Sequence, residues 1–337
     1  MDKTESQVMP VPPNLITALR AGFDAVASQV LVILIPVGLD LLMWLGPHLQ
    51  VKTIIDKFLN ALVASAQLST NPNGDLFTTG VDAVHTAAAQ YNLLSLLRTI
   101  PVGIPSLMAS RLPIQTPKGI PIMLEIPNVI IAIAVAIGLI LAGLVAGSLY
   151  YSMVTQIVMQ GKLELKKVLQ DWTWGSFQVI SLAAAFLILF LAISIPSSCV
   201  ISVITLFGLP LGQFALFLYI GVLLWLAFPL LFSAHGIFIN HNNALTSVKR
   251  SMVMTRMTLP TTTLFIFVIL VVGEGLNLLC SVPPETSWLT LLGVGGHAFI
   301  SSSLLASSIY YYKDADHWAQ ETLKIVKSQA GISVKAS

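Results

Sequence analysis

Charged residues are scarce in this sequence. Asp, Glu, Lys and Arg make up 9% of its 337 residues, against about 25% in an ordinary soluble domain, and none of the four occurs in residues 172–248. A soluble fold of this size covers its surface with charge, so this scarcity excludes a conventional water-soluble globule. The 55% of hydrophobic residues and the mean hydropathy of +0.85 indicate that a bilayer surrounds most of the chain.

Cysteines, basic runs and enzyme motifs are also rare or missing. Two cysteines make neither a disulfide framework nor a Cys-x-x-Cys metal or redox motif. A net charge of +2 without a basic run argues against nucleic acid as a partner. The sequence has no P-loop, His-Glu-x-x-His, Gly-x-Ser-x-Gly or dinucleotide motif. We therefore expect no enzyme activity, no catalytic residue, no metal site and no cofactor.

Six apolar stretches are long enough to cross a bilayer, which takes about 20 residues. They cover residues 25–45, 129–153, 179–204, 214–237, 259–280 and 288–311. The predicted fold is an all-α integral membrane protein with six transmembrane helices. The amino end carries acids and prolines rather than a basic region, so we expect the first span to be retained and not cleaved as a signal peptide.

The lysines and arginines predict the orientation, because they are kept on the cytoplasmic side of short loops. With the amino terminus inside, most of them fall on inner segments, and the two short outer turns carry none. The remainder lie in the long first loop, where the rule is weak. Both termini are therefore predicted to be cytoplasmic, in a bacterial cytoplasmic (inner) membrane.

Short basic segments precede the hairpins and suggest an internal repeat. Residues 161–168 align with residues 241–248, and residues 14–20 align with residues 243–249. We predict three units, each an interfacial amphipathic helix followed by a helical hairpin; chance similarity of apolar sequence is the alternative. The predicted segments are an amphipathic helix and first span (1–46), an extracytoplasmic cap (47–127), the second span (128–160), the second hairpin unit (161–240), the third hairpin unit (241–312) and a cytoplasmic amphipathic tail (313–337).

The basic segments have apolar residues at helical spacing, which is typical of helices that lie in the membrane plane. Their cations are candidates for contacts with anionic lipid headgroups. These candidates are Lys166, Lys167, Lys249, Arg250 and Arg256. Ordinary positive-inside anchoring is the plainer explanation of the same residues.

One of these segments resembles a known family. Residues 243–251 (Asn-Ala-Leu-Thr-Ser-Val-Lys-Arg-Ser), followed by residues 254–260 (Met-Thr-Arg-Met-Thr-Leu-Pro) and a span, resemble the YciC-like bacterial membrane proteins and the membrane domain of glycerophosphoryl diester phosphodiesterases. The resemblance implies a six-helix cytoplasmic-membrane domain. It transfers no catalytic residue, because the phosphodiesterase activity belongs to a separate soluble domain.

The long first loop departs from the repeat. Two amphipathic stripes, at residues 54–63 and 81–97, predict a small helical cap, and six prolines between 101 and 127 exclude a continuous helix up to the second span. The apolar stripes either dock on a partner, cover a pore mouth, or pack on each other and on the membrane. An insertion of this length is where a distinguishing function is expected.

Three ionisable residues stand out inside predicted spans, where such residues are costly and suggest function. They are Asp40, Glu274 and His297, all expected near the outer ends of their helices. A protonatable site, with His297 exchanging a proton with a carboxylate, is one interpretation. Hydration at the headgroups, or pairing with Arg98 or Arg111 of the loop, is the other.

Small residues and cysteines give weaker signals. Gly143 and Gly147 form a Gly-x-x-x-Gly step that predicts close helix packing, in particular of the second and sixth spans. Cys199 and Cys280 occupy equivalent outer positions and form either a disulfide or two independent buried thiols.

Two functions are consistent with these features. The first is a non-enzymatic accessory, assembly or interaction component that contacts the lipid bilayer and a membrane-protein partner or a second copy of itself. The second is a proton-coupled transporter or channel that uses Asp40, Glu274 and His297. We favour the first, because polar residues inside the spans are too sparse for a hydrophilic path.

Overall fold

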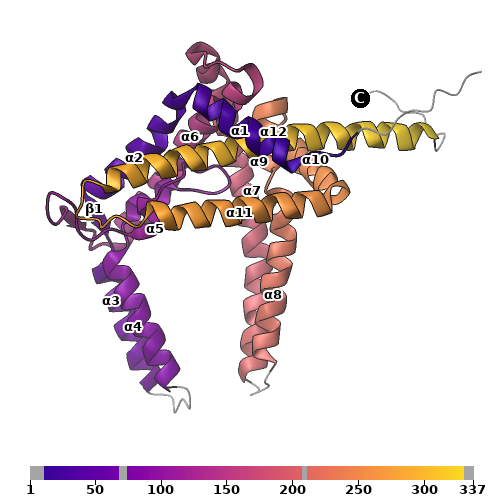
Figure 1. The fold of residues 1–337 in the computed structure, drawn as a ribbon. Helices are drawn as coiled ribbons and strands as arrows, with labels where there is room; N and C mark the ends of the chain where they lie inside the picture. Colours follow the sequence, from indigo (N-terminus) through magenta and orange to yellow (C-terminus); the bar gives the residue numbers. More distant parts are fainter. Residues whose placement is uncertain (1–10, 68–73, 207–210, 330–337) are drawn as a thin grey trace, which may run out of the picture. The chain divides into compact units, whose positions relative to one another are not determined.

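The chain is mainly α-helical (Figure 1). The structure, a computed structural model, describes residues 11–67, 74–206 and 211–329. Its helices are α1 (Leu15–Ser28), α2 (Leu34–Leu45), α3 (Lys52–Gln67), α4 (Gly74–Gln90), α5 (Met108–Arg111), α6 (Val129–Gln160), α7 (Leu165–Leu206), α8 (Gly212–Ala227), α9 (Ser233–Asn240), α10 (Ala244–Met257), α11 (Leu259–Cys280) and α12 (Thr290–Gln329). Three 3₁₀ helices, η1 (Val30–Ile33), η2 (Leu93–Leu97) and η3 (Phe228–Leu230), and two short strands, β1 (His48–Gln50) and β2 (Met123–Glu125), complete the described elements.

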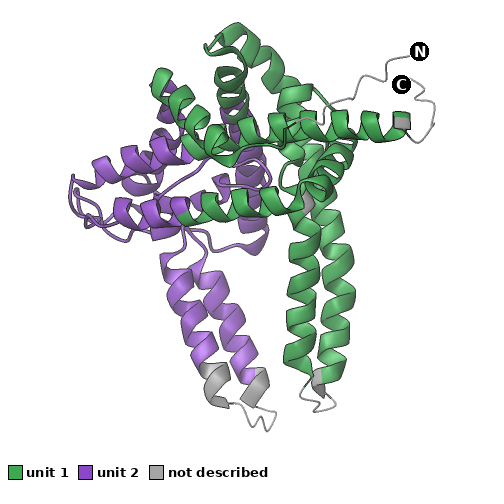
Figure 2. Cartoon of the chain, turned by 45° about the vertical axis from the view of Figure 1, so that its right-hand side comes forward, with its two compact units in different colours: residues 1–29, 151–271, 303–337 green, residues 30–150, 272–302 purple. Residues whose placement is uncertain are grey.

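The chain divides into two compact units (Figure 2). Unit 1 comprises residues 1–29, 151–271 and 303–337, and unit 2 comprises residues 30–150 and 272–302. Helices α6, α11 and α12 contribute residues to both units. Residues 1–10, 68–73, 207–210 and 330–337 lie outside the described residues.

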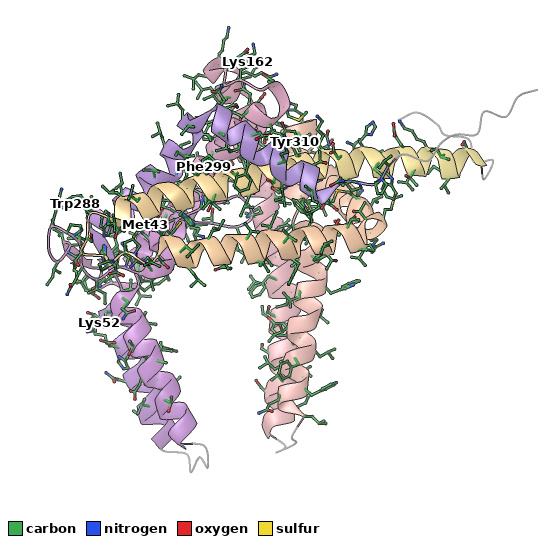
Figure 3. All side chains as sticks on the ribbon, in the orientation of Figure 1. Met43, Lys52, Lys162, Trp288, Phe299 and Tyr310 are labelled. Atoms are coloured by element: carbon green, nitrogen blue, oxygen red, sulfur yellow. The ribbon has the colours of Figure 1, made fainter. Side chains whose placement is uncertain are left out.

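Four helices are long and apolar enough to cross a membrane: α6, α7, α11 and α12. A fifth span results if α1 is counted together with η1 and α2. The structure therefore contains four or five candidate spans among its described residues, where the sequence predicts six. Exposed apolar side chains cover α6, α7 and α11, as expected where lipid is the solvent, whereas half of the apolar window of α12 is buried. Figure 3 shows the side chains along the ribbon.

The first predicted span, 25–45, is not one straight helix. Helix α1 ends at Ser28, and the 3₁₀ helix η1 precedes α2. Pro36 lies in the first turn of α2, where its missing N–H costs nothing. Inside a continuous helix the same proline would remove a backbone hydrogen bond, so the helix begins anew at Leu34.

The fourth predicted span, 214–237, is also interrupted. Helix α8 has 16 residues and ends at Ala227, and η3 and α9 follow it as separate elements. Pro229 is in η3 and lacks the N–H that a continuing α-helix needs. Helix α8 is thus a shorter apolar helix than the 20 or so residues of a typical span.

Two predicted interfacial helices are not separate elements. Residues 165–168 form the first turn of α7, which continues to Leu206 without a break. The predicted tail helix at residues 317–329 is the last part of α12. No proline separates either interfacial segment from its span, so hydrogen bonding continues along one helix.

Unit 1 is held together by an aromatic core. It contains Ala18, Phe232, Met254, Phe265, Tyr311, Tyr312, Ala315 and Ala319, all buried. Phe265 and Tyr311 stack with ring centroids 4.1 Å apart, and the Tyr311 hydroxyl lies 3.0 Å from Thr262 Oγ1. Gly22 lets α1 approach α12 closely, because a Cβ at this position would collide with the backbone of Ser307.

Unit 2 contains the folded first loop. Strands β1 and β2 pair in parallel, with His48 opposite Met123 and Gln50 opposite Glu125. This pairing brings the two ends of the loop together. The Asn92 Oδ1 atom accepts from the Leu49 amide (3.0 Å), which fixes the end of α4 on β1. Loop 47–127 is therefore closed by its own hydrogen bonds.

Candidate functional site

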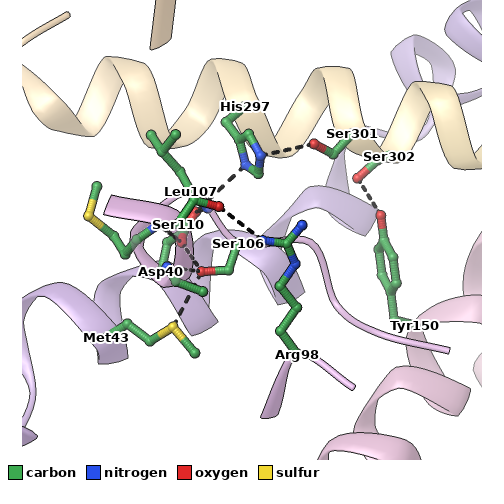
Figure 4. A network of polar contacts seen from close by, with 12 residues as sticks. Asp40, Met43, Arg98, Ser106, Leu107, Ser110, Tyr150, His297, Ser301 and Ser302 are labelled. Atoms are coloured by element: carbon green, nitrogen blue, oxygen red, sulfur yellow. Dashed lines mark hydrogen bonds and ion pairs between the residues drawn. The ribbon is translucent and has the colours of Figure 1, made fainter. Parts of the chain in front are cut away.

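Asp40 is the central residue of a polar cluster in unit 2. It lies on α2 and is fully buried. Its carboxylate accepts three hydrogen bonds from the first loop: from Ser106 Oγ (2.5 Å), from the Leu107 amide (3.2 Å) and from the Met108 amide (2.9 Å). Figure 4 shows these contacts. A buried carboxylate needs several such donors to compensate for lost hydration, and the loop supplies them.

The loop side of the cluster is itself ordered by hydrogen bonds. Ser106 Oγ donates to Asp40 and also accepts from the Ala109 amide (3.0 Å), which caps the start of α5. Arg98 Nη1 donates to Ser110 Oγ (2.9 Å), and the positive charge of Arg98 acts electrostatically on Asp40. Of the two alternatives for Asp40, the structure therefore favours interaction with the loop, mainly through a hydroxyl and two amides.

His297 of α12 lies on the other side of the carboxylate. Its Nδ1 atom is 3.9 Å from Asp40 Oδ2, which is too long for a hydrogen bond, and its Nε2 atom is 3.3 Å from Ser301 Oγ. The imidazole is largely buried, with 13% of its side chain exposed. The structure thus brings Asp40 and His297 together, as the sequence predicts.

Glu274 occupies a different position. It belongs to unit 2 and lies near enough to His297 to interact with it electrostatically, but its side chain is exposed on α11. The polar cluster therefore consists of Asp40, Ser106 and His297, with Glu274 outside its buried part.

No family model, curated protein or solved structure matches this chain. The residues of the cluster must therefore be judged on their geometry alone. Within the described part of the chain, no group of three or more His, Cys, Asp or Glu residues is placed to hold a metal ion.

A second set of contacts connects the loop to the turn between α11 and α12. Arg111 Nη2 donates to the Pro283 carbonyl (3.0 Å), and Arg111 Nε lies 3.9 Å from the carboxylate of Glu285. Trp44 Nε1 donates to the Glu285 carbonyl (3.0 Å), and the Trp44 and Trp288 rings meet edge to face at 6.0 Å. The sequence does not predict a role for Glu285.

The Gly143–Gly147 step is a packing site, but the partner of the glycines is the loop. A Cβ at Gly143 would collide with the Leu97 carbonyl, and one at Gly147 with the Val102 carbonyl. Small residues allow backbone to approach a helix closely, whichever element supplies that backbone. The predicted contact between α6 and α12 occurs instead at Tyr150, whose hydroxyl donates to Ser302 Oγ (2.8 Å).

The candidate lipid-headgroup residues all lie in unit 1. Lys166, Lys167, Lys249 and Arg256 are exposed, whereas Arg250 is half-buried and its Nη1 atom lies 3.9 Å from Asp316 Oδ2. Four of the five cations are thus available to an anionic headgroup. Arg250 is partly engaged within the protein.

A buried polar group in unit 1 is not predicted by the sequence. His235 of α9 lies with Nε2 2.8 Å from Ser308 Oγ of α12, and Asn240 Nδ2 donates to Asp316 Oδ2 (3.3 Å). The His235 side chain packs against the rings of Phe232 and Tyr312. Its only sequence signal is a lone histidine at the end of an apolar stretch.

The two cysteines lie on different helices. Cys199 is exposed on α7, and Cys280 is half-buried at the end of α11. The two cysteines belong to different units, so whether they form a disulfide stays a prediction.

Proposed function

We propose that this protein is a non-enzymatic component of a bacterial cytoplasmic membrane, one that presents its first loop as a folded cap to a membrane-protein partner. The observation that carries this proposal is the set of three hydrogen bonds that the loop donates to Asp40. A carboxylate whose oxygens are occupied by two amides and a hydroxyl holds the loop in place. Burying a carboxylate such as Asp40 inside a span costs free energy. Its use to hold a loop supports a scaffold more than a transport path.

The α3–α4 hairpin of the cap is the surface we assign to the partner. The two helices bury Leu59 and Ala88, and His85 Nδ1 lies 2.8 Å from Asp56 Oδ1 between them. Phe58 and Val84 remain exposed, with 66% and 46% of their surfaces accessible. Exposed large apolar side chains on a helix outside the spans are typical of a docking surface.

The fold of unit 1 supports the predicted orientation with both termini in the cytoplasm. Ser194 of α7 and Tyr219 of α8 are hydrogen-bonded at 2.7 Å, so the two helices lie side by side. Gln178 Oε1, in the first half of α7, accepts from the Ala244 amide at the start of α10 (2.9 Å). The chain therefore returns along α8 to the side on which α7 begins.

A return through α8 adds a sixth crossing to the five candidate spans. Helix α8 is about 24 Å long at 1.5 Å per residue, and the three residues of η3 add about 6 Å. Together they match a hydrocarbon core of about 30 Å. Six crossings place both termini on one side. The resemblance to the YciC-like proteins remains a prediction and adds nothing to this argument.

A partner pull-down tests the scaffold. The full chain, extracted in a mild detergent, should retain a stoichiometric membrane protein detectable by mass spectrometry. Phe58→Asp should lower its recovery about tenfold, because burying a charge where an aromatic anchor docked costs well over 1 kcal/mol. Asn60→Asp adds the same charge at an exposed position of the same helix and should leave recovery unchanged. The absence of any stoichiometric partner would contradict the proposal.

Proton transport through the Asp40 cluster is the second candidate, favoured by the 3.9 Å separation of His297 Nδ1 and Asp40 Oδ2 and by the exposure of Glu274. It is tested by valinomycin-driven proton entry into liposomes containing the protein and a pH-sensitive dye. If Glu274 takes part, Glu274→Gln should slow proton entry, whereas Asp82→Asn on exposed α4 should not. The scaffold proposal expects no protein-dependent proton entry in any of the three proteins.

A further inference from the structure

A groove in unit 1 lies between the α8–η3 segment and the α10–α11 segment. Its volume is about 430 Å³, within the range of sites that hold small ligands. Leu224, Trp225, Phe228 and Leu259 give it apolar walls, and Arg256 is the one charged residue among the described residues that line it. Trp225 is 71% exposed and Leu224 65%, so the groove is open to whatever surrounds the helices.

A buried hydroxyl beside Arg256 has no partner. Thr255 lines the groove, is 1% exposed, and its Oγ1 atom makes no hydrogen bond within the described residues. The neighbouring threonines differ: Thr258 and Thr263 each donate to the carbonyl four residues earlier. A buried hydroxyl left unpaired is unfavourable. An oxygen acceptor in the groove would satisfy it.

We propose that this groove binds the acyl chain and headgroup of an anionic phospholipid. The apolar walls match an acyl chain and Arg256 matches a phosphate. Thr255 lines the same groove and has a hydroxyl that lacks an acceptor within the described residues. No acidic residue lines the groove among the described residues. An anionic headgroup therefore meets a cation without a competing carboxylate.

The position of the groove fits a lipid of the inner leaflet. Arg256 is in the last turn of α10, and Leu259 begins the apolar helix α11 two residues after α10 ends. A phosphate at Arg256 thus lies where the polar segment meets the span, and the groove continues along Leu259 and Thr263 into the span. This placement rests on the orientation proposed above.

The site differs from a general attraction of basic residues to the membrane surface. Lys249 lies on the same helix and is exposed, but it does not line the groove. If the lipid were held only by the field of the basic residues, Lys249 and Arg256 would contribute equally. Lipid binding in the groove requires Arg256 and does not depend on Lys249.

Retention of lipid by the purified full chain tests the proposal. The protein is incubated in mixed micelles with equal amounts of phosphatidylglycerol and phosphatidylcholine, passed through gel filtration, and its retained lipid is measured by mass spectrometry. The unmodified protein should prefer phosphatidylglycerol. Arg256→Gln should lower its retention about fivefold, corresponding to about 1 kcal/mol. Lys249→Gln should not change it, and Arg256→Lys should largely preserve it.

The apolar wall has its own matched pair of variants. Trp225→Ala should lower the retention of phosphatidylglycerol, whereas Phe217→Ala, an exposed aromatic of α8 outside the groove, should not. Circular dichroism confirms that each variant is folded. Equal losses for Arg256→Gln and Lys249→Gln, or no preference for phosphatidylglycerol, would overturn the proposal. If the protein instead forms a lipid-free dimer and Trp225→Ala dissociates it, the groove binds a second copy of the chain and not a lipid. Because the assay measures lipid, its outcome is independent of the partner pull-down.

Discussion

At the scale of single residues, hydrogen bonding decides what the buried charges do. Asp40 accepts from Ser106, Leu107 and Met108, so its carboxylate joins a helix to a loop more than sixty residues away in the chain. His48, outside the spans, is also held by a hydrogen bond, because its Nε2 donates to the Met43 carbonyl (3.1 Å). Burial lowers the pKa of its imidazole. Both side chains connect the cap of unit 2 to α2.

Replacing Asp40 tests its role as an anchor. Asp40→Ala should leave a buried hydroxyl and two amides without an acceptor, and should lower the free energy of unfolding in detergent by about 3 kcal/mol. The measurement is denaturant-induced unfolding followed by circular dichroism. Asp82→Ala, at an exposed carboxylate of α4, should change it by less than about 0.5 kcal/mol. A folded Asp40→Ala protein of unchanged stability would refute the anchor role.

At the scale of elements, the length of apolar sequence predicts helices well where breakers bound them. The predicted span 259–280 coincides with α11, and the predicted start at residue 129 is the start of α6. The predicted helix ends are wrong at Pro36 and Pro229, because hydropathy does not register a missing N–H. A proline in an apolar stretch does not always end the helix, since α7 continues through Pro196. The sequence also does not predict which element packs against a helix face. Gly143 and Gly147 indicate a close approach, but not which part of the chain approaches them.

Gly147→Val tests the contact between α6 and the loop. The added side chain would overlap the Val102 carbonyl, so the loop must move, at a cost of about 1–3 kcal/mol. We expect a lower melting temperature in detergent and faster tryptic cleavage after Arg98 and Arg111. Gly138→Val places the same side chain on the same helix where nothing lies within 4 Å. It should leave both measurements unchanged, and equal effects from the two variants would contradict the contact.

At the scale of the whole molecule, the number of crossings determines where the termini lie. Six crossings put the termini on the same side of the membrane, as four would, and five put them on opposite sides. The difference depends on α8, which is short for a span but is paired with α7 by the Ser194–Tyr219 hydrogen bond. The number of crossings therefore depends on whether both helices of the α7–α8 hairpin in unit 1 span the membrane.

Labelling single cysteines distinguishes the two counts. In a protein with Cys199→Ala and Cys280→Ala, Lys118→Cys of the loop and Lys327→Cys near the end of α12 are both exposed positions. In bacterial spheroplasts an impermeant maleimide should label Lys118→Cys directly and Lys327→Cys only after permeabilisation. Labelling of Lys327→Cys in intact spheroplasts would show that the loop and the carboxyl end share a side and would exclude cytoplasmic termini.

The sequence by itself determined the solvent and the fold class, because composition averages over the chain and a bilayer demands apolar helices regardless of their arrangement. It also identified Asp40 and His297, since ionisable residues inside spans stand out against apolar surroundings. Only the tertiary structure decided their partners. The donors to Asp40 are a serine hydroxyl and two backbone amides in a proline-rich loop. Nothing in the sequence distinguishes these donors from other serines and amides. The same holds for the groove at Arg256, which exists because α8 and α10–α11 lie together in space while remaining distant in sequence.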